Sequence, residues 1–158
     1  MHFILGNAEL ECMLKGRKFS KVVSHRFAEI KKRYNLKQIE LEIVFFCSQT
    51  EDQNYKDGIS ARDICTKLIL NKGQVSTALD SLTEKGYLKA IPSKKDKRII
   101  YYKITEKTEP IIEDVRSTGT ELTEKLFKGI SEEEMELVRG VMKQFGSNMD
   151  EIIETEWV

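Results

Sequence analysis

The sequence predicts a mainly α-helical protein with one small β-hairpin. Charged residues make up 33% of its 158 residues and prolines number only 2, a composition that favours a helix-rich, folded chain over a disordered one. Apolar residues recur at helical spacing along most of the chain. In one stretch they alternate instead, and this places Ile100, Tyr102 and Ile104 on one face of a strand.

Composition also excludes several classes of protein. No apolar run approaches the length of a membrane span, and the N-terminus becomes acidic too soon for a signal peptide, so we expect a cytoplasmic protein. The three cysteines form no CxxC pair and the two histidines lie far apart, so we expect neither a disulfide framework nor a metal site. The sequence contains no catalytic-triad spacing and no glycine pattern typical of nucleotide binding. We therefore expect neither an enzyme nor a cofactor.

Charge is distributed unevenly although the formal net charge is zero. Residues 72–103 carry 8 cations and 3 anions, a net of +5, whereas residues 106–156 carry 6 cations and 14 anions, a net of −8. A basic middle beside an acidic tail suggests a localised site for a polyanion.

Four helices are expected before the hairpin. Asn7 can cap the first, which runs to about Tyr34, and the second follows within "NLKQIELEIVFFCSQ". Ser60 caps the third, with Asp63 as its partner acid and Ile59 and Ile64 as a hydrophobic staple. Asn71 and Gln74 start the fourth, Gly86 ends it, and its apolar stripe consists of Val75, Ala78, Leu79 and Leu82.

The hairpin joins the strands "YLKAI" and "IIYYKI" through the basic tip "PSKKDKR". A fifth helix begins between Thr105 and Thr108, with Pro110 in its first turn, where spare N–H groups make proline acceptable. A Ser131–Glu134 capping box starts the sixth. The apolar positions of this sixth helix follow steps of three and four, which forms a heptad seam of the kind that packs against another helix. The seam residues are Met135, Val138, Met142, Phe145, Met149 and Ile152. That partner is either the fifth helix of the same chain or a second chain.

A short helix, a turn, a second helix and a basic hairpin form a winged helix-turn-helix, whose chemistry fits DNA. The fourth helix presents Lys72, Gln74, Ser76 and Thr77, which can reach base edges or phosphates in a major groove. The hairpin tip would lie along the neighbouring backbone or minor groove. It carries Lys94, Lys95, Asp96, Lys97 and Arg98, and Arg62 and Lys67 on the third helix are further possible phosphate contacts.

The stretch "NKGQVSTALDSLTEKGYLKAIPSKKDKRIIYYKIT" resembles the MarR (multiple antibiotic resistance) family of bacterial regulators. The matching features, in family order, are Val75-Ser76, Leu82, Lys85-Gly86, the wing motif Asp96-Lys97-Arg98 and Ile104-Thr105-Glu106-Lys107. The resemblance implies a homodimer whose base is built from residues 1–35 and 106–158, around a DNA-binding domain of residues 36–105. It also implies that Arg98 enters the minor groove and that Asp96 orients Arg98 or a neighbouring cation.

Three departures from the family pattern matter. Many relatives carry Arg where this chain has Thr77 and Ser81, so base reading rests more on Gln74, Ser76 and Thr77. The family's glycine after "TEK" is Thr108 here. A zinc-sensing branch shares the pattern "DKRIIYYKIT" but follows it with histidines, whereas this chain has "IIEDVRSTG", so we expect no such zinc site.

The resemblance implies a ligand-responsive transcriptional repressor that acts as a homodimer on a pseudo-palindromic operator, and we expect no enzyme activity. Two alternatives stay open. The first is a winged-helix module that binds an acidic protein partner. The second is a thiol-based redox sensor of the same fold that uses Cys12, whose neighbour Lys15 is opposed by Glu9 and Glu11. Cys47 and Cys65 occupy apolar stripes and are expected in the core.

Overall fold

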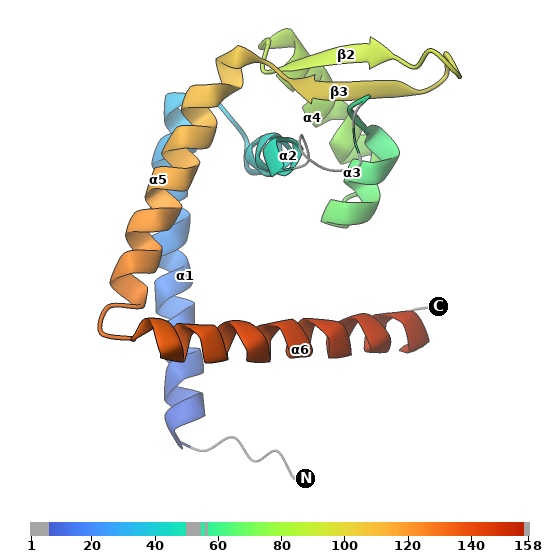
Figure 1. The fold of residues 1–158 in the computed structure, drawn as a ribbon. Coiled ribbons are helices and arrows are strands. Elements are labelled where there is room, and N and C mark those ends of the chain that lie inside the picture. Colours follow the sequence, from blue (N-terminus) through green and yellow to red (C-terminus); the bar gives the residue numbers. More distant parts are fainter. Residues whose placement is uncertain (1–6, 50–54, 56, 157–158) are drawn as a thin grey trace. The chain divides into compact units, whose positions relative to one another are not determined.

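A computed structural model describes residues 7–49, 55 and 57–156 (Figure 1). The chain divides into two compact units, Met1–Thr120 and Glu121–Val158. The helices are α1 (Asn7–Arg33), α2 (Gln38–Gln49), α3 (Ala61–Leu68), α4 (Lys72–Glu84), the short 3-10 helix η1 (Glu106–Thr108), α5 (Glu109–Leu126) and α6 (Glu132–Glu156). The strands are β1 (Ile59–Ser60), β2 (Leu88–Pro92) and β3 (Ile100–Ile104). The predicted mainly α fold with a β-hairpin is confirmed.

The sheet has three strands in the order β1-β3-β2, all antiparallel, so β3 is central. The predicted hairpin is β2–β3, in register from Leu88 opposite Ile104 to Pro92 opposite Ile100. The two-stranded prediction was incomplete, because β1 adds Ile59 opposite Tyr102. Gly58 precedes β1 with φ +105°, and a Cβ there would lie 2.9 Å from the carbonyl oxygen of Tyr102. Only glycine allows this close approach without a shift.

The helix starts follow the predicted capping chemistry. Ser60 and Asp63 form a complete capping box at α3, and Ser131 and Glu134 form another at α6. At α4 the Asn71 side chain accepts from the Gln74 N–H at 2.8 Å. The predicted Asn7 cap of α1 would sit at the edge of the described residues, and its side chain lies outside them.

The core of the first unit lies between α2, α3, α4 and the sheet, with α5 contributing its first turns. Side chains at or near zero exposure come from each of these elements: Ile43, Val44, Ile59, Ile64, Val75, Leu79, Leu82, Leu88 and Ile111. Cys47 is buried among them and Cys65 packs against them half-buried, so both are core residues as predicted. This packing fixes α4 with one face inward.

The start of α5 differs from the family pattern noted above. A 3-10 turn precedes the helix, and the wholly buried Thr108 closes that turn by accepting from the Thr105 N–H at 3.0 Å. The Thr108 hydroxyl also donates to the Tyr87 carbonyl at 3.1 Å. A threonine can therefore occupy the place of the family's glycine because its hydroxyl supplies these bonds. Pro110 lies in the first turn of α5, as predicted.

Candidate nucleic-acid interface

The two faces of α4 differ sharply. Val75, Ala78, Leu79 and Leu82 are buried, with exposures of 0–3%. The predicted DNA contacts are all exposed on the other side: Lys72, Gln74, Ser76 and Thr77. The fold thus presents a polar helix surface of the kind that enters a major groove, with the cation Lys72 at its start.

The first turn of α4 holds Gln74 in a defined position. The Asn71 side-chain amide donates to Oε1 of Gln74 at 2.6 Å, while the side-chain carbonyl oxygen of Asn71 accepts from the Gln74 backbone. The oxygen of Gln74 is therefore engaged in the cap, which directs its NH₂ group away from Asn71. In this arrangement Gln74 can donate to an acceptor such as guanine O6 or thymine O4.

The tip of the β2–β3 hairpin is organised by two side chains. Ser93 is 8% exposed, and its hydroxyl accepts from the N–H groups of Lys95 and Asp96 at 3.2 and 3.3 Å. The Asp96 carboxylate accepts from the backbone N–H of Arg98 at 2.9 Å. Asp96 therefore orients Arg98 through its main chain, and not through the guanidinium group as a side-chain pairing would require.

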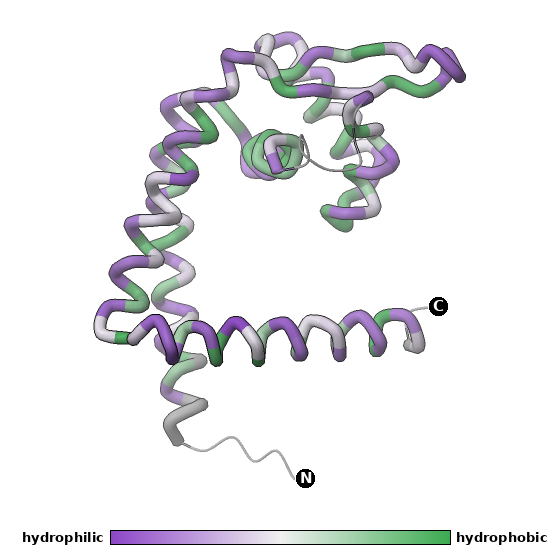
Figure 2. Tube along the Cα trace, viewed as in Figure 1, coloured by the Kyte–Doolittle hydropathy of each residue, from purple (hydrophilic) through white to green (hydrophobic). Residues whose placement is uncertain are grey.

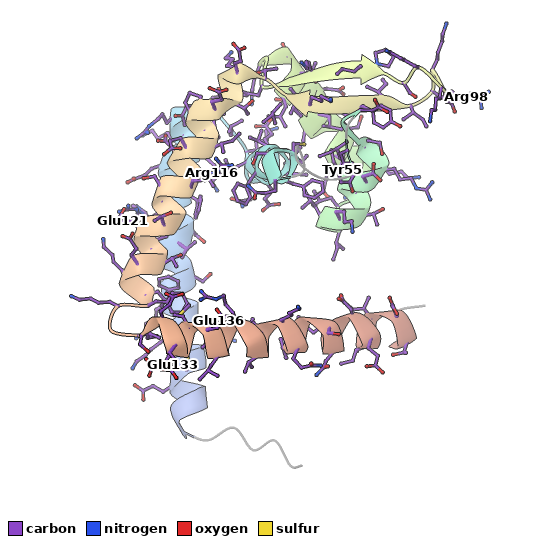
Figure 3. All side chains as sticks on the ribbon, in the orientation of Figure 1. Tyr55, Arg98, Arg116, Glu121, Glu133 and Glu136 are labelled. Atoms are coloured by element: carbon purple, nitrogen blue, oxygen red, sulfur yellow. The ribbon has the colours of Figure 1, made fainter. Side chains whose placement is uncertain are left out.

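The cations of the tip are exposed. Lys94, Lys95, Lys97 and Arg98 all lie in the exposed class, and Arg98 lies at the far end of the hairpin, away from the body of the sheet (Figure 3). Within the described part of the chain, none of them forms an ion pair. Arg62 and Lys67 on α3 are exposed as well. A rigid turn thus carries a group of unpaired positive charges.

A buried ion pair fixes the far end of α4. Nζ of Lys85 lies 2.9 Å from the carboxylate of Glu40, which is 1% exposed, and 2.7 Å from the Asn35 carbonyl. Burial alone would raise the pKa of Glu40. The Ser81 side chain, with the hydrogen bonds from the Lys37 N–H and Lys85, outweighs burial and lowers that pKa below the ordinary value. The carboxylate stays ionised and ties α2 to α4.

Residues of the motifs shared with the family, Lys85-Gly86 and Thr105 to Lys107, form a second set of contacts between elements. Nζ of Lys107 donates to the Lys85 carbonyl at 2.6 Å and lies 5.1 Å from the centre of the Tyr87 ring. The Thr105 hydroxyl donates to the Gly86 carbonyl at 2.8 Å. These bonds join the α4–β2 turn to the start of α5. The sequence pattern marks these residues only by resemblance and does not predict this structural role.

A cleft lies where α2, the end of β3 and α5 meet. It has a volume of about 480 Å³ and is lined by Ser48, Ile104, Glu109, Pro110, Ile112, Glu113 and Arg116. On the adjoining part of α5, Asp114 accepts from Arg33 at 2.6 Å and from the Tyr34 hydroxyl at 2.8 Å, which ties α1 to α5. Sequence reasoning did not predict this cleft, because its walls come from three distant segments.

The six predicted interface residues of α6 belong to the second unit. Met135 is half-buried. The other five are exposed: Val138, Met142, Phe145, Met149 and Ile152, with exposures of 43–59%. Cys12 on α1 is exposed, and its neighbour Lys15 pairs with Glu11 at 2.7 Å.

Comparisons with known proteins agree with this geometry. Residues 36–108 match the family of winged helix DNA-binding domains. The HTH-type transcriptional regulator MhqR of Bacillus subtilis is 28% identical over 87 residues, which cover 55% of this chain and 60% of that protein. The matched region therefore spans less than two thirds of the relative.

Two solved structures extend the likeness to almost the whole chain. A MarR protein from Peptoclostridium difficile has a TM-score of 0.67 at 17% identity, with 96% of this chain and 92% of that chain covered. A mutant MepR from a multidrug-resistant clinical isolate of S. aureus has a TM-score of 0.72 at 17% identity, with 94% and 99% covered. No described helix is long and apolar enough to cross a membrane.

Proposed function

We propose that this chain is a winged helix-turn-helix regulator of the MarR family. It would be a homodimeric, sequence-specific transcriptional repressor that releases its operator when a small ligand binds. The observation that carries the proposal is that one domain combines an exposed polar helix face with a hairpin tip of unpaired cations. Neighbouring grooves of B-DNA offer base edges to the first and concentrated negative potential to the second.

In the major groove, Lys72, Gln74, Ser76 and Thr77 of α4 would make the contacts. Gln74 would donate its held amide to a base, and Ser76 and Thr77 would bond to base edges or phosphates. Lys72, at the helix start, can reach either guanine or phosphate. Arg62 and Lys67 on α3 would add phosphate contacts that position the domain without reading sequence.

In the minor groove, Arg98 would be the inserted cation. Asp96 fixes its backbone, and Lys94, Lys95 and Lys97 would contact phosphates on either side. A prealigned turn loses less conformational entropy on binding than a mobile loop would. Residues 36–105 would thus form the DNA-binding domain.

The dimer would form through the flanking segments, residues 1–35 and 106–158. The apolar seam of α6, from Met135 to Ile152, is exposed in a single chain and would be covered by a second copy. Two copies then present two α4 helices to half-sites about one helical turn apart.

The regulatory step would use the cleft beside α5. Arg116 and Pro110 line it on the α5 side, and Ile104 lines it at the end of the wing strand. A ligand there would contact both the DNA-binding domain and α5, and so could favour a spacing of the two α4 helices that no longer matches the operator. Structures similar to this chain include a MepR–DNA complex and a PefR–heme complex, which show both kinds of binding in those proteins.

The test begins with selection of bound fragments from the source genome, followed by fluorescence anisotropy on one selected duplex. Arg98→Ala should weaken binding by roughly tenfold to a hundredfold, since one arginine seated in a DNA groove contributes about 1–3 kcal/mol. Lys143→Ala, an exposed lysine of α6, removes a charge elsewhere and should leave the affinity unchanged. Equal loss in both variants would remove the proposed role of the hairpin.

Both alternatives make different predictions. A protein-binding module would show no salt-dependent affinity for duplex DNA. A redox sensor built on Cys12 would lose its peroxide response in Cys12→Ser. The pairing of Lys15 with Glu11 disfavours it, because the cation one turn from the thiol is already engaged.

A further inference from the structure

Three helices of the first unit end in the same closing turn. One or two residues after each helix, a residue has a positive φ: +52° at Asn35, +53° at Ile69 and +76° at Gly86. The next residue then donates its N–H to a carbonyl five residues back, which is the Schellman pattern. These bonds run from Leu36 to Lys31 at 2.8 Å, from Leu70 to Cys65 at 3.0 Å and from Tyr87 to Leu82 at 2.9 Å.

Ile69, at the second of these turns, is a residue type that rarely adopts this left-handed backbone conformation. Glycine adopts a positive φ freely and asparagine does so at little cost, and these are the residues at the other two turns. A β-branched side chain in the left-handed region is a genuine outlier. Isoleucine there should reduce the folding equilibrium constant roughly fivefold to thirtyfold relative to glycine.

Packing does not explain the isoleucine either. Leu70, the next residue, packs against the core and supplies the hydrophobic contact of the turn. Ile69 itself is 79% exposed, the highest value among the large apolar side chains of the described residues. A strained backbone that displays an apolar side chain to solvent points to a functional reason.

The position suggests that reason. Ile69 lies in the turn of the helix-turn-helix, two residues before the cap of α4, and is flanked by the exposed cations Lys67 and Lys72. The apolar group that a base pair presents in the major groove is the C5-methyl of thymine. We propose that Ile69 is a specificity residue that contacts a thymine methyl beside the base pairs reached by α4. This inference rests on the proposed DNA-binding function.

The experiment separates stability from binding. Ile69→Asn should raise the thermal midpoint, because asparagine relieves the strained turn, yet weaken binding to the selected operator by about fourfold, the equivalent of one buried methyl contact. Asn35→Gly is the matched control, since it alters the same turn at the end of α1 and should leave affinity unchanged. Ile69→Gly, which also removes the Cβ, should repeat the loss of affinity.

The thymine contact is tested by replacing each thymine of a half-site with deoxyuridine, which removes only the methyl group. The wild-type protein should lose about fourfold at one position, the same methyl contact, and Ile69→Asn should lose nothing there. Equal operator affinity for wild type and Ile69→Asn would overturn the inference, as would the same deoxyuridine profile for both proteins. Failure of the wild-type protein to bind any duplex would instead overturn the proposed function, and it would be seen before any variant is made.

Discussion

The winged-helix domain buries its apolar residues, whereas α6 exposes many of its own. In the domain, Ile64, Val75 and Leu82 have no exposed surface. In α6, the seam residues Met142 and Phe145 are 59% and 54% exposed. Hydrophobic and hydrophilic segments alternate along α6 (Figure 2). The domain is therefore stabilised by its own contacts, whereas the apolar surface of α6 is exposed and, under the proposed function, needs a second copy of the chain to cover it.

The largest expected effect tests that need for a partner. Met142→Glu combined with Phe145→Glu places two charges in the seam and should convert the protein to a monomer. Operator affinity should fall by roughly a hundredfold to ten-thousandfold, because two linked half-site contacts become one. Sedimentation equilibrium and anisotropy measure the two changes.

The control for this prediction is Gln144→Glu, which adds a charge to the same helix outside the seam. It should remain dimeric and bind normally. A double variant that stays dimeric would show that α6 does not form the interface through these residues.

The second prediction applies one substitution to both regions. Leu82→Ala creates a cavity in a fully buried site and should lower the free energy of unfolding by about 2–5 kcal/mol. Leu137→Ala, at an exposed site outside the seam, should change it by less than about 0.5 kcal/mol. Urea unfolding measures both, and similar losses would contradict the division between the regions.

The third prediction concerns the ion pair inside the domain. Glu40→Gln should cost about 1.5–3 kcal/mol at pH 7, because Lys85 loses a charged hydrogen-bond partner. The pKa of Glu40 is lowered on folding, so its contribution is present above the pKa of about 4.3 expected in the unfolded chain and is lost as pH falls through the folded value. Urea unfolding should therefore find the variant and the wild type converging below about pH 4. A difference that stays constant from neutral pH down to about pH 3 would contradict an ionised Glu40.

The smallest expected effect is at the hairpin. Lys97→Ala should reduce the slope of log affinity against log salt by about 0.9, the loss of one phosphate contact, and weaken all duplexes alike. Lys143→Ala should leave the slope unchanged. A loss confined to the selected operator would instead make Lys97 a base-reading residue.

Sequence reasoning succeeded where structure is local. Capping pairs such as Ser60–Asp63 and Ser131–Glu134, and the glycine at the end of α4, each act within a few residues, so their signals can be read directly. It missed β1 because a strand of two residues exists only through its pairing with β3. It also missed the Glu40–Lys85 pair, whose members are 45 residues apart.

Sequence reasoning also could not predict the direction in which side chains point. The sequence marked Gln74 both as a capping partner and as a base reader, and only the structure defines which end of its amide is engaged. It predicted that Asp96 orients Arg98 or a neighbouring cation, and only the structure defines that the carboxylate accepts from the Arg98 backbone N–H. At Ile69 the sequence offers no glycine or asparagine to signal a left-handed turn, so packing of the neighbouring Leu70 decides the backbone there.

The most direct test of the account is the mass of the complex with a selected operator, measured by sedimentation together with footprinting. We predict two chains on one duplex, protecting two half-sites about one helical turn apart. One chain on each duplex, or equal affinity for selected and random sequences, would contradict a dimeric, sequence-specific regulator.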